Sequence, residues 1–318
     1  MSKLKALLVG PGAHAQKYLL PSIELSDSFE LVAVVGGNQG NVVAARHGSL
    51  WLSDLGSALD SVAIDVALIA TPPAAHFAAT RTCLEQGVHV LCEKPLCTTA
   101  VEVEHLTELA RSLNLVLYEG FMFLVHPQFQ ELKKALSLSQ FKTINARFGF
   151  PDRTKSDFRY SPDGGGALLD AGVYPIAAAC EILDNPRVVG AFVSFDTQRG
   201  IDRAGLAILE DSENRIGIIE WAFGRAYVND ISAWGEAAVV HCERAFSKPP
   251  DLATSIVIST AEGTRSQRID AANHFDIQLV EFARSVDSPD LLSLERIRQR
   301  FHLIEEVREL QSKGHFVE

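Results

Sequence analysis

The sequence has few cysteines and lacks any long apolar run. Its 318 residues include five cysteines, at positions 83, 92, 97, 180 and 242, and this odd, scattered set fits neither a disulfide framework nor a zinc site. Apolar runs such as Val62–Ala70 are much shorter than the ~20 residues that cross a bilayer. The first residues also lack the small-residue cleavage site of a signal peptide. We therefore expect a cytoplasmic protein with reduced thiols, no metal and no membrane segment.

Positive charge is also scarce. Lys and Arg number 29 against 40 Asp and Glu, which gives a formal net charge of −11. Nucleic-acid binding needs a basic face, so we expect a small-molecule partner in place of nucleic acid. Hydrophobic residues make up 47% and charged residues 22% of the chain, which is the balance of a globular protein, and the length suits two domains.

Apolar strand-like runs alternate with helical stretches in the first part of the chain. The predicted strands are 4–10, 31–36, 66–71, 89–94 and 115–121, and the predicted helices between them are 13–25, 74–86 and 98–113. Near-continuous apolar strands joined by helices are typical of a parallel sheet covered on both faces. The pattern predicts a doubly wound α/β domain of Rossmann type over residues 1–121.

Residues 122–318 show a different pattern. A helix at 127–138 and a strand at 143–150 precede a helix that ends at Leu183, and five strands then follow one another between residues 188 and 242. Consecutive strands with short turns predict an open mixed sheet in an α+β domain. Two helices end the chain, near 275–286 and 293–313, and the last of them could pack back against the first domain.

A glycine-rich turn follows the first predicted strand. It has the form G-x-G-x-x-A and consists of Gly10, Pro11, Gly12, Ala13, His14 and Ala15. The first glycine permits a tight turn, the second lets the backbone approach a pyrophosphate, and the small last residue lets helix and strand pack closely. The N–H groups at the start of the helix would then face the phosphates. The turn therefore predicts dinucleotide binding.

The end of the second strand has no carboxylate. NAD sites carry an Asp or Glu there that binds the ribose hydroxyls, whereas this chain has Gly36, Gly37 and Asn38. A carboxylate would repel a 2′-phosphate, so its absence favours NADP(H), with NAD(H) as the alternative cofactor. Gly37 and Asn38 are then cofactor-binding candidates, and Arg46 is the nearest arginine that could bind the phosphate.

Candidate ligand-binding turns follow the third and fourth strands, at the sheet edge where ligands of parallel sheets bind. Their residues are Thr71, Pro72, Pro73 and His76 after one strand, and Glu93 and Lys94 after the other. Two interpretations fit each turn. The prolines could simply stop a strand beside a solvated helix, or these residues could line the cofactor. Lys94 could be solvated, or its ammonium could donate a hydrogen bond to a carbonyl oxygen and stabilise the alkoxide that forms.

The motifs G-x-G-x-x-A, A-T-P-P-x-x-H and C-E-K-P-L stand in this order along the chain. The chain resembles, over nearly its whole length, the glucose–fructose oxidoreductase and inositol dehydrogenase family (Gfo/Idh/MocA). The resemblance implies an NAD(P)-binding Rossmann domain followed by an open-sheet domain. It implies a catalytic role for Lys94 and a cofactor-side position for Glu93. It also implies a homo-oligomer formed through the outer face of the sheet, for which the apolar stretch Ile216–Ala222 is suited.

A second glycine-rich segment, Gly164–Pro175, matches the family's G-G-G-x-L-x-D-x-G-x-H pattern except at its last position, which is Tyr174. Asp170 lies four residues earlier, so an α-helix would place both on one face. Many relatives have a histidine acid/base where this chain has a phenol, which could protonate a developing alkoxide beside the Lys94 ammonium. The alternative is a tyrosine that only packs in the core, with Asp170 as a structural acceptor.

The tyrosine form resembles two branches of the family, the nucleotide-sugar 3-ketoreductases and the dihydrodiol dehydrogenases. Segments similar to the first branch begin at Glu119, Asp157, Trp234 and Arg244. That resemblance implies reduction of the C3 keto group of a nucleotide-linked keto-deoxysugar with NADPH. Lys94, Tyr174 and Asp170 would then be catalytic, and the substrate-binding candidates are Phe121, Phe123, Arg159, Tyr160 and Tyr174. The alternatives are a dehydrogenase of a free sugar, polyol or trans-dihydrodiol, and a cofactor-binding regulatory protein without turnover.

Overall fold

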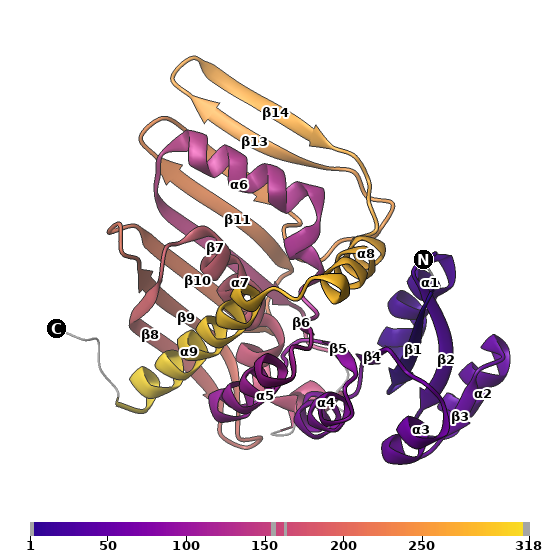
Figure 1. The fold of residues 1–318 in the computed structure, drawn as a ribbon. Helices are drawn as coiled ribbons and strands as arrows, with labels where there is room; N and C mark the ends of the chain where they lie inside the picture. Colours follow the sequence, from indigo (N-terminus) through magenta and orange to yellow (C-terminus); the bar gives the residue numbers. More distant parts are fainter. Residues whose placement is uncertain (1–2, 154–156, 162–163, 314–318) are drawn as a thin grey trace. The chain divides into compact units, whose positions relative to one another are not determined.

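The computed structural model describes residues 3–153, 157–161 and 164–313, and Figure 1 shows their fold. The chain divides into two compact units, one of residues 1–120 with 275–298 and the other of residues 121–274 with 299–318. Residues 275–298, which the sequence analysis assigned to the second domain, therefore group with the first unit. Each unit has its own sheet and core.

The first unit has a six-stranded parallel sheet in the order β3-β2-β1-β4-β5-β6. The strands are β1 (Leu4–Val9), β2 (Phe29–Val35), β3 (Leu50–Leu52), β4 (Val66–Ile69), β5 (His89–Cys92) and β6 (Leu117–Glu119). The helical elements are η1 (Ala15–Leu19), α1 (Leu20–Leu25), α2 (Asn38–His47), α3 (Leu55–Ser61), η2 (Pro73–Ala75), α4 (His76–Glu85), α5 (Ala100–Leu113) and α8 (His274–Asp287). The strand order reverses between β1 and β4, which is where such sheets bind ligands. The predicted Rossmann fold is confirmed.

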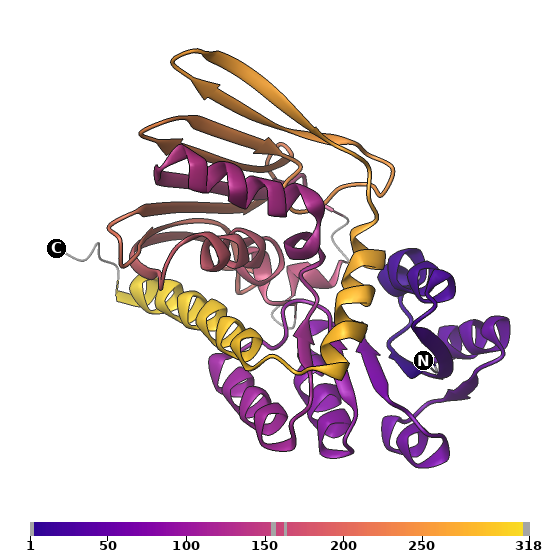
Figure 2. The ribbon, with the colours of Figure 1, turned by 45° about the horizontal axis from the view of Figure 1, so that its top comes forward.

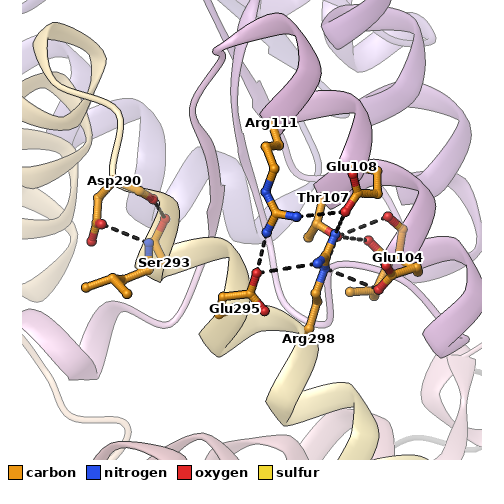
Figure 3. Close-up of polar contacts among 10 residues, drawn as sticks. Glu104, Thr107, Glu108, Arg111, Asp290, Ser293, Glu295 and Arg298 are labelled. Carbon is orange, nitrogen blue, oxygen red and sulfur yellow. Dashed lines mark hydrogen bonds and ion pairs between the residues drawn. The ribbon is translucent and has the colours of Figure 1, made fainter.

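The side chain of Arg298 links α5 to the first turns of α9 (Leu291–Lys313) within this unit, as Figure 3 shows. Its Nε donates to Thr107 Oγ1 at 2.7 Å, and its guanidinium also pairs with Glu104, Glu108 and Glu295. The pairs share one largely buried guanidinium, so they form a network, which contributes more than the same pairs would if isolated. This network fixes the start of α9.

The second unit has an eight-stranded mixed sheet in the order β14-β13-β12-β11-β7-β10-β9-β8. The strands are β7 (Phe141–Phe150), β8 (Arg187–Asp196), β9 (Ile201–Glu210), β10 (Ile216–Phe223), β11 (Val228–Gly235), β12 (Val239–Glu243), β13 (Thr254–Thr260) and β14 (Gly263–Ile269). β7 and β10 pair in parallel, and the other described pairs are antiparallel. The predicted open mixed sheet is confirmed.

Besides the later part of α9, the second unit contains several described helical elements. They are η3 (Met122–Val125), α6 (Pro127–Ser139), η4 (Phe158–Tyr160), η6 (Leu168–Gly172) and α7 (Val173–Ile182). Figure 2 shows α6 and α7 on the same side of the strands. α6 contacts β11 to β13, while η6 and α7 contact β7 and β10. The apolar residues of the strands alternate between the two faces, and those beneath the helices form the core.

The five cysteines are free thiols, and each is buried. Burial raises the pKa of Cys83 to about 12, because the thiolate would lose its hydration. In the part of the chain that the structure describes, none of the helices is both long and apolar enough to cross a membrane.

Candidate active site

The glycine turn after β1 leaves room for a ligand beside its backbone. Gly10 has a φ of +82°, and a Cβ there would lie 2.7 Å from Thr71 Cγ2, so a side chain would be both strained and crowded. At Gly12, by contrast, a Cβ would have no atom within 4 Å. Gln16 Nε2 donates to Pro11 O at 2.8 Å and supports the turn. The turn is thus held in place at Gly10 and Pro11, while the space beside Gly12 is open.

The turn after β4 adds a buried polar atom beside Gly10. The hydroxyl of Thr71 is buried and has no hydrogen-bond partner among the described residues. Such orphaned groups are rare, because an unpaired buried polar atom costs stability. A ribose hydroxyl or a phosphate oxygen would supply the missing partner. The open backbone at Gly12 and the hydroxyl of Thr71 therefore fit a dinucleotide.

The end of β2 presents Gly37 and Asn38 at the start of α2. Gly37 caps the helix without a side-chain hydrogen bond, so the first N–H groups of α2 have no capping side chain. Trp51 Nε1 donates to Gly36 O at 2.9 Å and fixes this turn. Arg46 lies in the last turn of α2, and the helical rise places it ~12 Å along the axis from Asn38. The structure therefore does not bring Arg46 to the end of the helix where Gly37 and Asn38 lie.

His76 connects two turns of the first unit. Its Nε2 lies 2.7 Å from Thr71 O and its Nδ1 lies 2.8 Å from Pro95 O, and the ring is buried. Burial lowers the pKa of His76, although the two carbonyls and Glu93 oppose this shift. Since both ring nitrogens face backbone oxygens, His76 positions the turns after β4 and β5. The sequence predicted that His76 contacts the cofactor directly. The geometry instead favours a role in positioning the two turns.

Glu93 and Lys94 follow β5, in a turn whose Lys94–Pro95 peptide bond is cis. The carboxylate of Glu93 is buried and lies 3.1 Å from His14 Nε2 in the glycine-turn segment. Burial would raise the pKa of Glu93, but His14 and Lys94 outweigh it, so the pKa lies below its usual value. Glu93 thus joins the glycine turn to the turn that carries Lys94. Lys94 is half-buried at the carboxyl end of the sheet.

In the second unit, Tyr174 lies at the start of α7 inside a shell of aromatic rings. The residue is only 7% exposed. The surrounding rings, with centroid distances between 4.9 and 6.0 Å, are Phe121, Phe123, Phe148 and Phe246. The predicted substrate residues Phe121 and Phe123 are thus brought to Tyr174. A shell of this kind limits the contact of the phenol with water and strengthens any interaction that the phenol makes.

Asp170, Arg159 and Asp157 are joined by ion pairs. Arg159 Nε donates to Asp170 Oδ2 at 2.9 Å, and its Nη1 donates to Asp157 Oδ1 at 3.0 Å. Asp170 lies in η6, a π-helical turn, so the four-residue spacing to Tyr174 is not that of a regular α-helix. Two carboxylates offset the charge of Arg159, which makes it a poorer oxyanion ligand than the sequence predicts.

Tyr160 lies in a separate buried group. Its hydroxyl donates to Asp152 Oδ1 at 3.1 Å and accepts from Arg153 N at 2.9 Å. The guanidinium groups of Arg199 and Arg203 lie over its ring. Because its hydroxyl is already bonded to the protein, Tyr160 supports this part of the unit, where the sequence predicted a substrate contact.

Asp202, which no sequence motif indicated, anchors the segment that carries Asp170 and Tyr174. Its buried Oδ2 accepts from Leu168 N at 2.8 Å and from Trp221 Nε1 at 3.0 Å. Burial raises its pKa to about 6. Gly166, with a φ of +72°, approaches so closely that a Cβ would lie 2.2 Å from Asp202 Oδ1. The glycine repeat was the only signal in the sequence, and it marked the close approach without naming the partner.

The chain matches two family models. Residues 4–121 match that of the oxidoreductase family with an NAD-binding Rossmann fold, and residues 128–246 match the GFO/IDH/MocA C-terminal domain. A dTDP-3,4-didehydro-2,6-dideoxy-α-D-glucose 3-reductase from Streptomyces violaceoruber is 30% identical over 295 residues, which are 89% of this chain and 86% of that protein. A trans-1,2-dihydrobenzene-1,2-diol dehydrogenase from Xenopus laevis is 30% identical over 63% of this chain and 60% of its own.

The fold is also similar to that of a solved 3-ketoreductase from Actinomadura kijaniata in complex with NADP and TDP-benzene. The TM-score is 0.91 at 28% identity, and the match covers 96% of this chain and 97% of that one. Structures of the same reductase include a tyrosine-to-phenylalanine variant and a lysine-to-alanine variant.

Proposed function

Since this chain belongs to the Gfo/Idh/MocA oxidoreductase family, we propose that it uses NADPH to reduce the C3 keto group of a nucleotide-linked keto-deoxysugar. The observation that carries the proposal is Tyr174, which stands within an aromatic shell at the position where the family pattern given above ends in histidine. The 3-reductase from Streptomyces violaceoruber and the 3-ketoreductase from Actinomadura kijaniata, which binds NADP and TDP-benzene, support the same substrate class.

The proposed chemistry divides the work between two residues. NADPH, when bound, supplies the hydride to the carbonyl carbon. The ammonium of Lys94 donates a hydrogen bond to the keto oxygen and stabilises its growing negative charge. The phenol of Tyr174 transfers its proton to that oxygen, which completes the alcohol, and then regains a proton from solvent. Asp170 acts as a positioning residue, because it is paired with Arg159 next to the turn that leads to Tyr174.

The proposed residues for the cofactor come from the turns after β1, β2, β4 and β5. The open backbone at Gly12 and the orphaned hydroxyl of Thr71 support binding of the pyrophosphate and ribose. The uncapped N–H groups at the start of α2 suit a 2′-phosphate, and no carboxylate stands in Gly36–Gln39 to repel it. These features favour NADPH over NADH.

The test is an assay of NADPH oxidation with a panel of carbonyl substrates. We expect turnover with a dTDP-linked 3,4-diketo-deoxysugar, and a kcat/KM with NADH at least about 10-fold lower, because a bound 2′-phosphate gains charge-assisted hydrogen bonds. Free sugars, polyols and trans-dihydrodiols with NADP⁺ are the comparison substrates. Faster turnover of a dihydrodiol would favour the activity of the Xenopus relative. NADPH binding without turnover on any of them would favour a regulatory protein.

The homo-oligomer is proposed to form through the sheet face opposite α6 and α7. Ile216, Thr143, Trp234 and Val239 lie opposite one another across four strands, hence on one face, and Trp234 is 72% exposed. Adjacent apolar residues of this kind are typical of an interface.

We expect Trp234→Glu to shift the assembly toward monomer in sedimentation measurements, since a carboxylate there could be buried only at high cost. Leu138→Glu, at an exposed position of α6, is the matched control and should leave the assembly unchanged. An unchanged mass for Trp234→Glu would rule out this interface.

A further inference from the structure

A cation and an aromatic ring form an exposed platform in the second unit. The guanidinium of Arg244 lies 4.6 Å from the ring centroid of Tyr227, and both side chains are exposed. Arg244 has a φ of +53°, a left-handed conformation that is uncommon for residues other than glycine. Among the described residues its guanidinium has no carboxylate or carbonyl partner, so its N–H donors are unused by the protein.

A buried amide holds both parts of this platform. Asn229 Nδ2 donates to the hydroxyl of Tyr227 at 2.9 Å and to Ser247 O at 2.7 Å, while its Oδ1 accepts from Phe246 N at 2.8 Å. The amide is thus fully used in fixing Tyr227 and the backbone that follows Arg244. Buried hydrogen bonds therefore fix the geometry of the platform.

Aromatic rings connect this platform with Tyr174, the proposed general acid. The ring of Phe148 neighbours both Tyr227 and Tyr174, with centroid distances of 6.5 and 4.9 Å. Phe246, two residues after Arg244, lies 6.0 Å from Tyr174. Tyr174 is therefore the buried end, and Tyr227 the exposed end, of one continuous run of rings. A substrate that reacts at Tyr174 could extend toward Arg244.

We propose that Arg244 and Tyr227 bind the nucleoside diphosphate part of the substrate, an inference that rests on the proposed function. A guanidinium stacked on a ring keeps its planar donors free for two oxygens of a diphosphate. The ring and the guanidinium plane offer a surface on which a base can stack. Arg159, the sequence candidate for this task, already pairs with two carboxylates, whereas the part of the chain that the structure describes places no carboxylate on Arg244.

The test is calorimetric binding of dTDP and of thymidine to the full chain loaded with NADP⁺. Arg244→Ala should raise the dissociation constant for dTDP roughly 10-fold or more and leave thymidine binding nearly unchanged, because only the diphosphate is charged. Tyr227→Ala should weaken both ligands roughly 10-fold, while Tyr227→Phe, which keeps the ring, should change them less than about threefold.

Arg81→Ala is the matched control, because it removes an exposed arginine that stacks on the ring of Phe77 in the first unit. It should not affect dTDP binding, and the affinity for NADPH should be equal in every variant. If the unaltered chain binds dTDP but Arg244→Ala binds it within about twofold, the platform assignment is overturned and the proposed function stands. If the unaltered chain does not bind dTDP, the nucleotide-sugar function is overturned as well.

Discussion

Replacing Tyr174 with phenylalanine is expected to lower kcat about 10²- to 10³-fold while KM changes little. The variant removes one hydroxyl, and general acid catalysis of this kind typically contributes 10²- to 10⁴-fold. The ring itself remains in the shell of Phe121, Phe123, Phe148 and Phe246, so packing is preserved and the chain should melt within a few degrees of the original. The measurement is steady-state NADPH oxidation with the keto substrate.

A tyrosine outside this shell provides the control. Tyr118→Phe removes a hydroxyl from a ring that packs on Phe282 in the first unit, and its kcat should stay within about threefold. NADPH affinity should be equal in both variants. A Tyr174→Phe enzyme with full turnover would contradict the acid role and leave Tyr174 as a packing residue. Loss of NADPH binding in that variant would point instead to a disturbed fold.

The fold could be predicted where burial imposes a pattern. β4 is apolar throughout because the sheet is covered on both faces, so its sequence indicates a parallel strand. β14 could not be found this way, because six of its seven residues are exposed or half-buried and it exists through its pairing with β13. The prediction also missed α2, which contains Gly40 and two asparagines and has only a weak apolar stripe.

Some residues of the candidate site could be predicted from local sequence, and others could not. Gly10 and Gly12 could be predicted because a tight turn and an open backbone demand glycine locally. The contacts of His76 with Thr71 and Pro95 could not be predicted, because the order of motifs does not indicate which backbone atoms a side chain will contact. The partners of Arg159 and the anchor Asp202 depend in the same way on contacts that no local pattern encodes.

The spacing between Asp170 and Tyr174 is the clearest case. The sequence predicted an α-helix and hence a shared face, but the chain forms a π-helical turn at Leu168–Gly172 before α7 begins. A π-helical turn has i→i+5 hydrogen bonds in place of the i→i+4 bonds of an α-helix, so the angle between residues four apart differs slightly, and such turns are frequent at functional sites. Propensities do not distinguish it from an ordinary helical turn. The geometry of Asp170 and Tyr174 therefore depends on a turn that the sequence pattern does not reveal, and the ion pair of Asp170 with Arg159 is a contact that the spacing did not predict.

Replacing Lys94 with alanine is expected to reduce kcat/KM about 10³-fold, at least as much as the tyrosine variant. The ammonium stabilises charge that appears on the keto oxygen only as the reaction proceeds, and loss of one such donor typically costs about 3–4 kcal/mol. Lys94→Arg should recover little, because a planar guanidinium does not reproduce a point charge in the turn beside the buried Glu93. Lys3→Ala, at an exposed lysine, is the control.

The double variant of Lys94→Ala and Tyr174→Phe tests whether the two residues serve one oxygen. If they do, each loses part of its benefit when the other is absent, and the double variant should be much less impaired than the product of the two single losses. Full multiplication of the losses would mean that they act on separate steps or separate atoms. Equal losses in the double variant and in Lys94→Ala alone would mean that Tyr174 donates its proton only to an oxygen already bound by Lys94.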